Sequence, residues 1–478
     1  MTAPVKLPGA AQDRGRDGVY ARPLLWMLAL AYACNFMDRS VIATLAQAIK
    51  TDLLLSDGQL GLLQGFAFVV LYCLMGLPMA WLAERRNRIS LISICLVIWS
   101  GMTMVCGLAQ NFVHLLLARI GVGVGEAGCN PCSHSMIADT FDAGQRSRAL
   151  SIYQLGATAG TMLGAILAGQ VAQHFGWRAA FVAVGIPGIV VALAMKLTMK
   201  DPPRRPDTTT GATQALADPL PVLKWLLGNR AIVHLELGFT LASFAYGAIS
   251  GFNQPYFIRA FGLTVGEIGL IFGISSGLAS ATCLIVSGWL TDRCAARGNL
   301  WYARLAIIGM LCALPAIFAA YTVGDWRIAA ILTFVSGFFM NWFIIPSLSL
   351  FHKLLGVRRV ATGMTLLLMF QNFLGLGAGP FAAGLVIDAA TRSLFASTGH
   401  GAFAAQCPGG QAIAGAGADM VQACHAALLG GTRVGLLAAI AILVWACLHY
   451  FIAGRLVARI APDHPFGRRP RYDTGEKA

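Results

Sequence analysis

Long apolar runs recur from one end of the chain to the other, and each is close to the roughly 20 residues that a helix needs to cross the hydrocarbon core of a bilayer. Charged residues, glycines and prolines separate the runs. The pattern therefore predicts an all-α integral membrane protein with twelve transmembrane helices. The predicted spans are 24–47, 59–83, 89–109, 112–137, 146–172, 178–197, 230–257, 264–290, 301–322, 326–352, 360–390 and 431–455.

Residues 198–229 are the long polar interruption in the middle of the chain, and they include the segment Asp201-Pro-Pro-Arg-Arg-Pro206. Such a composition predicts a linker. It divides the spans into two bundles of six. The predicted divisions are a tail at 1–23, bundles at 24–197 and 230–455 with a long connection at 391–430, and a second tail at 456–478.

Composition supports the membrane assignment, because only 12 % of the 478 residues are charged, against roughly a quarter in a soluble protein. The net charge of +14 raises the alternative of a nucleic-acid partner. Most Lys and Arg residues, however, lie in the tails and in the connections on one face. The opposite face carries only Lys50, Arg178, Arg259, Arg327, Arg392 and Arg433.

Positive charge on short cytoplasmic loops sets the orientation of a membrane protein. We therefore expect both termini in the cytoplasm and the protein in the inner membrane of a bacterium, with the lipid bilayer as its partner and no nucleic acid. The alternative, a basic RNA-binding tail around Arg468, Arg469 and Arg471, is disfavoured by this asymmetry. We also expect a monomer.

Twelve cysteines do not predict a disulfide framework, because most fall inside apolar spans, where cysteine behaves as a small hydrophobic residue. Cys129 and Cys132 lie in a predicted helix with no second pair at metal spacing, so we expect no metal and no cofactor. Cys407 and Cys424 differ, since both lie in the extracytoplasmic connection 391–430. An oxidising compartment allows them to form a disulfide, and the sequence leaves open whether they do.

An internal repeat relates the two bundles. Shifting the chain by 208 residues aligns Leu55-Ser-Asp-Gly-Gln-Leu-Gly-Leu-Leu-Gln-Gly65 with Leu263-Thr-Val-Gly-Glu-Ile-Gly-Leu-Ile-Phe-Gly273, and Trp81-Leu-Ala-Glu-Arg85 with Trp289-Leu-Thr-Asp-Arg293. Because six spans are an even number, the second bundle repeats the first in the same orientation. Parallel repeats of this kind place a binding site between the bundles near the midplane and allow alternating access.

Several segments resemble the major facilitator superfamily. Ala80-Trp-Leu-Ala-Glu84-Arg85-Arg86-Asn87-Arg88 is similar to its signature loop between helices 2 and 3, and Gly288-Trp-Leu-Thr-Asp292-Arg293 to the second copy. Ala80, Glu84 and Asn87 depart from the usual pattern. Gly176-Trp177-Arg178 resembles the start of the sixth helix of that superfamily.

The resemblance implies a cytoplasmic gate in which the acidic and basic residues of the two loops bridge the bundles. The candidate gate residues are Glu84, Arg85, Arg88, Asp292 and Arg293. Glu84 is expected to face the positive N-terminal end of the eleventh span. The alternative is that the arginines only mark the cytoplasmic side.

Within the superfamily, Asn35-Phe-Met-Asp38-Arg39, Arg119-Ile-Gly-Val-Gly-Val-Gly-Glu126 and, more loosely, Pro255-Tyr-Phe-Ile-Arg259 are similar to the spinster-like branch. Animal members of that branch export lysophospholipids or sphingosine phosphate. The resemblance implies an amphipathic lipid as substrate, whereas other members of the superfamily with similar motifs move small organic acids or drugs.

Four charges lie inside the predicted first and fourth spans, where one charge near the bilayer centre costs about 2.5–3.5 kcal/mol even on insertion scales. At about 1.5 Å per residue, Asp38 and Arg119 lie at nearly the same depth, and Glu126 lies two turns from Arg119 on the same helix face. We expect these residues and Arg39 along one wall of a cavity, with a carboxylate and a guanidinium in contact.

Burial favours the protonated carboxyl group and a nearby arginine favours the charged one, so the balance shifts when the partner moves. Asp38 and Glu126 are therefore the candidate proton-coupling groups. Arg39 and Arg119 are candidates for their partner or for the anchor of an anionic substrate. The alternative is a static salt bridge that joins the first and fourth helices.

The second bundle supplies mostly amides. Asn341, Gln371 and Asn372 are candidates for the other wall of the cavity, or else make hydrogen bonds between helices. Glu236 is a candidate for substrate binding or for an ion pair, but it lies near a helix end from which it can also reach water.

The sequence favours a transporter over an enzyme or a sensor. Gly273-Ile-Ser-Ser-Gly277 matches the nucleophile motif of hydrolases, but that motif needs a strand before the turn and here it lies inside a predicted membrane helix. The absence of a Walker motif argues against direct ATP drive. The prediction is a secondary transporter, coupled to protons or else an uncoupled facilitator, for an anionic or amphipathic small molecule.

Overall fold

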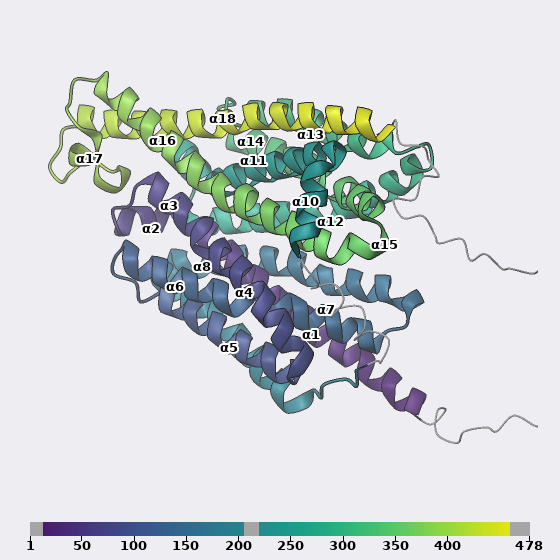
Figure 1. The fold of residues 1–478 in the computed structure, drawn as a ribbon. Helices are drawn as coiled ribbons and strands as arrows, with labels where there is room; N and C mark the ends of the chain where they lie inside the picture. Colours follow the sequence, from purple (N-terminus) through teal and green to yellow (C-terminus); the bar gives the residue numbers. More distant parts are fainter. Residues whose placement is uncertain (1–12, 205–218, 459–478) are drawn as a thin grey trace, which may run out of the picture.

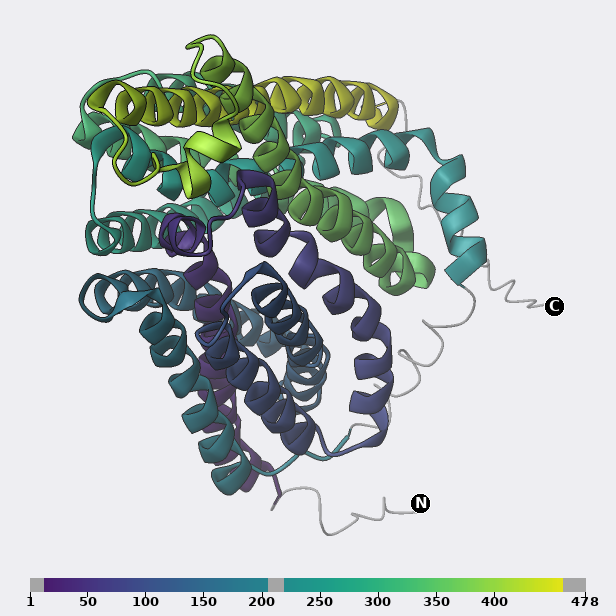
Figure 2. The same cartoon turned by 90° about the vertical axis from the view of Figure 1, so that its left-hand side faces the viewer.

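The computed structural model describes residues 13–204 and 219–458, and these residues form helices and connections with no strands. Two bundles lie side by side, the first drawn from purple to blue and the second from teal to yellow (Figure 1; Figure 2). The end at which the first helix begins and the last one ends is termed the terminal end, and the opposite end the distal end (Figure 1).

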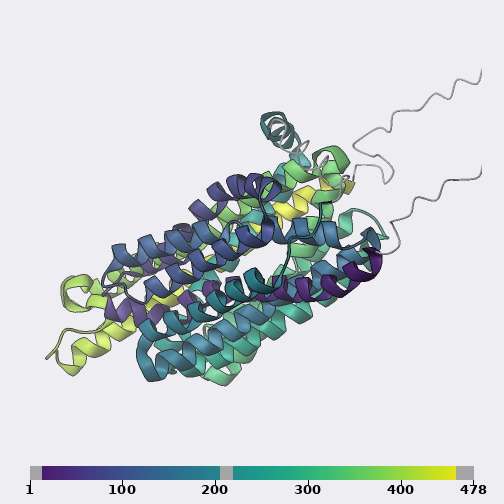
Figure 3. The same ribbon diagram turned by 90° about the horizontal axis from the view of Figure 1, so that it is seen from below.

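The first bundle contains six spans in five helical stretches. These are α1 (Asp13–Thr44), α3 (Asp57–Gln64) continued by α4 (Phe66–Arg85), α5 (Arg88–Cys106), α6 (Phe112–Glu126) continued by α7 (Cys129–Thr140), and α8 (Ala143–Thr198). The helix α8 holds two spans, because Gly176 has φ 83° and turns the chain there. Such a backbone conformation is accessible to glycine at little cost. Seen from below, the helices of this bundle run nearly parallel (Figure 3).

The second bundle repeats this arrangement. Its helices are α11 (Arg230–Phe261), α12 (Val265–Ala295), α13 (Leu300–Ala320), α14 (Trp326–Met340), α15 (Ile344–Phe370), the π-helix η1 (Gln371–Gly377), α16 (Ala378–Ala396) and α18 (Ala418–Ala458). Gly356, with φ 65°, turns the chain inside α15, so the tenth span ends and the eleventh begins there.

The prediction of twelve spans in an all-helical fold is confirmed. Ten stretches of the described residues are long and apolar enough to cross a membrane, and one of them, Gly144–Thr198, contains two spans. The helix α1 supplies the remaining one. With 32 residues α1 is long enough to span a membrane, but Asp38 and Arg39 lower its mean hydropathy, so it is not among the ten apolar stretches.

Helix ends differ from the predicted boundaries at several points. The polar linker contains a short helix, α10 (Pro219–Gly228), which lies across the long helices near the terminal end (Figure 1). The helices α16 and α18 both extend into the predicted connection 391–430 and leave α17 (Phe403–Gln406) and η2 (Pro408–Gly410) between them. Hydropathy marks the hydrocarbon core, whereas a helix continues into polar surroundings. The remaining parts of the linker and tails, at 1–12, 205–218 and 459–478, lie outside the described residues.

The repeat is visible in the way two equivalent helices begin. Ser56 caps α3 by accepting a hydrogen bond from the Gln59 amide, and the Gln59 side chain accepts one from the Ser56 amide. Thr264 and Glu267 make the same reciprocal pair at the start of α12. Such a capping box satisfies two helix-terminal N–H groups. The offset of 208 residues thus relates equivalent positions in space.

The two bundles touch at the distal half through glycines. A Cβ atom on Gly61 would lie 2.1 Å from the carbonyl oxygen of Pro380, and one on Gly65 2.0 Å from that of Gly377. Across the other contact, Gly169 of α8 faces Gly269 of α12. These positions, termed the glycine seam, allow the backbones of the two bundles to pack directly against each other.

Candidate functional site: a cavity between the bundles

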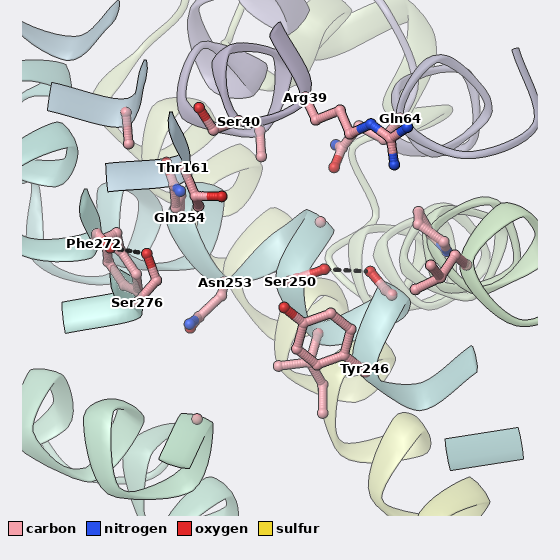
Figure 4. A pocket seen from close by; sticks show the side chains of 18 of the residues that line it. Arg39, Ser40, Gln64, Thr161, Tyr246, Ser250, Asn253, Gln254, Phe272 and Ser276 are labelled. Carbon is pink, nitrogen blue, oxygen red and sulfur yellow. Dashed lines mark hydrogen bonds between the residues drawn. The ribbon is translucent and has the colours of Figure 1, made fainter. Parts of the chain in front are cut away.

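A cavity of about 360 Å³ lies between the two bundles. Helices from both bundles line it, among them α1, α4 and α6 of the first and α11, α12 and α14 of the second. Arg39 reaches it from one side, and Tyr246, Ser250 and Asn253 of α11 reach it from the other (Figure 4). Its place between parallel repeats is the one that the duplication predicts for a binding site.

Arg39 is the most accessible charge of the cavity wall, with 28 % of its side chain exposed. Its guanidinium carbon lies 5.2 Å from the ring centre of Phe36, 4.5 Å from that of Phe68 and 5.0 Å from that of Tyr72. Its Nε atom donates a hydrogen bond of 2.9 Å to Oε2 of Glu126. Three aromatic rings and one carboxylate therefore fix this cation at the edge of the cavity.

Asp38 lies behind this wall rather than in it. Its residue is 1 % exposed, and neither carboxyl oxygen has a hydrogen-bond partner among the described residues. Thr103 of α5 lies beside it, and Arg119 donates to its main-chain oxygen at 3.5 Å. The expected contact between a carboxylate and a guanidinium is thus made by Glu126 and Arg39, and not by Asp38.

The geometry of a helix explains this pairing. Consecutive residues point about 100° apart, and in the rotation that α1 adopts, Arg39 faces the cavity while Asp38 points into the first bundle. Of the four charges expected along one wall, Arg39 and Arg119 line the cavity, while Asp38 and Glu126 are buried behind it. Unpartnered polar atoms of Asn35, Arg119 and Glu126 lie in the same region.

The wall from the second bundle has the opposite character. Among the lining residues it contributes no charged side chain, but many hydroxyl and amide groups. Asn341 and Asn372 line the cavity, whereas Gln371 is turned away and donates to Ser243 at 2.9 Å. The sequence did not single out the lining residues Ser250, Asn253, Gln254, Ser275, Ser276 and Ser280. Polar residues recurring every three or four positions along α11 were the available signal.

Glu236 lies outside the cavity, nearer the terminal end of α11. Its Oε1 atom accepts a hydrogen bond of 3.0 Å from Thr240, and its Oε2 atom is buried without a partner among the described residues. The Oε2 atom is therefore enclosed by the second bundle, while the residue as a whole is partly exposed.

A cluster of charges joins the two bundles at the distal end. Asp57 accepts a hydrogen bond of 2.6 Å from Arg259 and one of 2.7 Å from Lys50, and all three residues are at most 5 % exposed. Asp388 of α16 accepts from the main-chain amides of Asp57 and Gly58 at 2.9 and 2.8 Å. These four charged residues, Lys50, Asp57, Arg259 and Asp388, are termed the distal lock.

The sequence indicated Lys50 only as a charge of the opposite face, and Arg259 as another such charge that ends a segment similar to the spinster-like branch. Their meeting point was not predictable, because Arg259 and Asp57 are 202 residues apart and belong to different bundles. A hint was present in Asp57 itself, an acid in the first turn of a helix inside the repeated segment.

The connection between α16 and α18 covers the distal lock. Cys407 and Cys424 form a disulfide in the structure, which ties this connection to α18. Gly409 and Gly410, both with positive φ, pack on Lys50 and Leu54 at the end of α2 (Ala46–Asp52). The covering explains why Lys50 is only 2 % exposed although it lies near the end of the molecule.

The chain resembles proteins of a known family over most of its length. An MFS-type efflux pump of Mycolicibacterium smegmatis is 30 % identical over 392 residues, which is 81 % of this chain and 90 % of that protein. The chain belongs to the major facilitator superfamily. The family model of that name matches residues 28–252.

Two further similarities place the chain in the spinster-like branch of the superfamily. Human protein spinster homolog 1 is 27 % identical over 387 residues, covering 75 % of this chain and 71 % of that protein. A crystal structure of a bacterial homologue of the human lysosomal transporter Spinster, inward-facing and unoccupied, superposes with a TM-score of 0.83. It is 31 % identical and covers 92 % of this chain and 98 % of its own. The predicted superfamily, branch and fold are confirmed, and the protein is a membrane transporter and not an enzyme.

The signature loop of the superfamily lies at the terminal end, between α4 and α5. Arg88 is fully buried there and binds Asp139 of α7 and Asp201, which follows α8, as well as the carbonyl oxygen of Pro202. All these partners belong to the first bundle or to the residues directly after it. Arg88 thus holds the start of the linker rather than the second bundle.

The other candidate gate residues make no ion pair in the part of the chain that the structure describes. They are Glu84, Arg85, Asp292 and Arg293, and the two arginines stack on the tryptophans of their own loops, Trp81 and Trp289. In this structure, the described ion pairs between the bundles lie in the distal lock and not in the signature loops.

Proposed function

We propose that this transporter is a proton-coupled secondary transporter that moves an anionic or amphipathic small molecule by alternating access. The observation that carries the proposal is the pairing of Arg39 with Glu126 at the cavity edge, next to the unpartnered carboxyl group of Asp38. A buried carboxyl group without a partner is favoured in its neutral, proton-bound form.

In this proposal, substrate binding at Arg39 and proton binding at Glu126 are linked. An anionic group that enters the cavity competes with Glu126 for Arg39, since a guanidinium binds carboxylate and phosphate alike. Once Glu126 loses that partner, its buried charge becomes costly and the group takes up a proton. Release of the substrate restores the Arg39–Glu126 pair and frees the proton again, with Asp38 as the neighbouring carrier.

The closed distal end supports the alternating-access part of the proposal. The distal lock and the glycine seam hold the bundles together there, while the described signature loops do not bridge them at the terminal end. With the terminal end in the cytoplasm of a bacterial cell, this arrangement corresponds to an inward-facing state. The inward-facing homologue of similar fold agrees with this assignment.

The chemistry of the cavity favours a substrate with a negative charge and an apolar part. Arg39 and Arg119 supply the positive charge, and Phe36, Phe68 and Phe272 supply apolar surface. Lysophospholipids and apolar organic acids both fit this description. A thermal-shift series with purified protein and a panel of lysophosphatidate, lysophosphatidylcholine and aliphatic carboxylates separates them, because a bound ligand raises the melting temperature.

Transport of the strongest ligand from that series into proteoliposomes tests the coupling. A pH difference of one unit supports about tenfold accumulation for each proton moved. We expect Asp38→Asn to lose this accumulation while retaining part of the exchange between labelled and unlabelled substrate. Asp419→Asn, an exposed acid in the first turn of α18, serves as the control and is expected to accumulate normally.

Two outcomes would overturn parts of the proposal. Accumulation that is unchanged in Asp38→Asn removes Asp38 from the coupling. Accumulation that is independent of the pH difference in the unmodified protein instead supports the uncoupled facilitator of the same fold.

A further inference from the structure

One face of α11 carries a row of polar residues and one glycine, termed the polar stripe. Its positions are Glu236, Thr240, Ser243, Gly247, Ser250 and Gln254. The spacing alternates between four and three residues, which keeps all of them on one side of a helix. At about 1.5 Å per residue, the stripe covers about 16 Å between Glu236 and Gly247, where the cavity begins.

Hydrogen bonds join two members of the stripe to each other and a third to a neighbouring helix. Thr240 donates to the carboxyl group of Glu236 at 3.0 Å, and Ser243 accepts from Gln371 of η1 at 2.9 Å. Ser250 and Gln254 line the cavity, and the Gln254 Oε1 atom is buried without a partner among the described residues. Polar side chains therefore recur along this face from Glu236 to Ser243 and again from Ser250, with Gly247 between them.

The helix that packs on the stripe is the irregular segment of the eleventh span. A Cβ atom on Gly375 of η1 would lie 2.8 Å from the Ser243 side chain and 3.1 Å from the Thr240 carbonyl oxygen. The π-helical segment η1 covers residues Gln371–Gly377. Its backbone hydrogen bonds join residues five apart, instead of the four of an α-helix. Short π-helical segments inside α-helices occur frequently at functional sites.

Among the described residues, Glu236 has no cationic partner. Tyr450 of α18 is a titratable group nearby: its ring would lie 2.9 Å from a Cβ atom on Gly238, two residues further along α11, and its hydroxyl is hydrogen-bonded to Ser347 of α15. His234 points to the other side of α11, where it pairs with His449 of α18. With hydroxyls and aromatic rings around it, the carboxyl group is more favourable neutral than charged.

We propose that Glu236 is a second proton-binding site, located in the second bundle and connected with the cavity by the polar stripe of α11. The proposal rests on the transport function proposed above but does not depend on Asp38 as the coupling group. Glu236 gives the second bundle, whose cavity wall is uncharged, a proton-binding group outside that wall. Each transport cycle then involves protons in both bundles.

Infrared difference spectroscopy tests proton binding without transport. Titrating the purified protein in lipid nanodiscs over pH produces a C=O band for each carboxyl group that gains or loses a proton. We expect Glu236→Gln to lack one such band. Thr240→Val, which removes the hydrogen bond but keeps the acid, is expected to retain the band at a shifted frequency. Glu267→Gln, an exposed acid of the α12 capping box, leaves the Glu236 band in place.

The number of protons moved for each substrate molecule supplies the second readout. We expect the ratio, measured from the pH difference that balances a known substrate gradient, to be lower by one proton in Glu236→Gln and to be restored in Glu236→Asp. An unchanged set of infrared bands in Glu236→Gln overturns the proposal, as does an unchanged ratio. If the unmodified protein shows no coupling at all, the function proposed above fails, and the infrared bands alone decide whether Glu236 binds a proton.

Discussion

The two copies of the internal repeat begin their helices with the same capping hydrogen bonds, but they make different polar contacts between the bundles. Ser56 and Thr264 cap α3 and α12 with the same reciprocal hydrogen bonds. One turn further on, Gly61 and Gly269 occupy equivalent positions, and each lies against the backbone of a helix from the other bundle. The duplicated residues thus build two matching close contacts.

The copies diverge at the residue after the cap, which is Asp57 in the first and Val265 in the second. Asp57 pairs with Arg259 and Lys50 to form the distal lock. At the second contact, Gln170 of α8 donates to the Gly266 carbonyl oxygen at 3.0 Å, a neutral hydrogen bond. The comparison indicates that close packing was inherited by both copies, while the ionic lock is particular to one.

The substitution Asp57→Asn, which removes the ionic contact that only the first copy has, is expected to have the largest effect. The substitution removes the carboxylate to which both Lys50 and Arg259 are paired, which costs the closed distal end about 3–5 kcal/mol. We expect the population to move toward a state open at the distal end. Labelling of a cysteine at the cavity position of Ser40 by a membrane-impermeant maleimide, applied from the distal side, reports the change.

Val265→Asn is the matched control in the second copy. It places the same side chain at the equivalent position without removing an ion pair, so labelling at position 40 is expected to stay near that of the unmodified background. Equal labelling in the two variants would show that the lock contributes nothing to closure.

A smaller effect is expected at the shared contacts. Gly61→Val and Gly269→Val each place a side chain where the opposing backbone leaves no room, at 2.1 Å and 2.5 Å from a carbonyl oxygen. Overpacking of this kind costs about 1–3 kcal/mol, or a shift of roughly 5- to 150-fold in the closed population. The same labelling assay measures it. The comparison predicts similar shifts for the two variants, and a shift in only one would contradict the equivalence of the contacts.

The smallest expected effect tests the duplicated caps. Ser56→Ala and Thr264→Ala each remove a side-chain acceptor at a helix start, which costs about 0.5–2 kcal/mol of stability. We expect the two variants to lower the melting temperature by similar amounts, measured by thermal unfolding in detergent. A double variant then shows the sum of the two, because the sites lie in different bundles. Strongly unequal losses would mean that the caps differ in their surroundings despite their identical geometry.

Much of the fold was predictable because it depends on local properties. Twelve spans follow from the length and hydropathy of each run, and the parallel arrangement follows from the 208-residue offset. The helix ends were less predictable, since α18 continues through thirteen residues of the predicted connection before the apolar run begins, from Ala418 to Gly430. Those residues are mixed in polarity, and hydropathy does not report their helicity.

The candidate site was predictable only in part. Charges inside spans pointed to Arg39 and Arg119, and both line the cavity. The partner of Arg39 was not predictable, because it depends on how α1 is rotated about its own axis. Arg88 shows a second limit: its partner Asp201 lies 113 residues away, and the resemblance to a gate gave no sign that the start of the linker folds back onto it.

The glycine seam also has a consequence for the membrane as an electrical barrier. Main-chain atoms of the two bundles pack together at Gly61, Gly65 and Gly169, which leaves no room for a water molecule at these three positions. A carrier that waits for its substrate with one end open must not conduct ions through the other. Close packing of backbone, rather than of mobile side chains, limits ion leakage through the closed distal end while the other end is open. The proton gradient that we propose drives transport is thereby preserved.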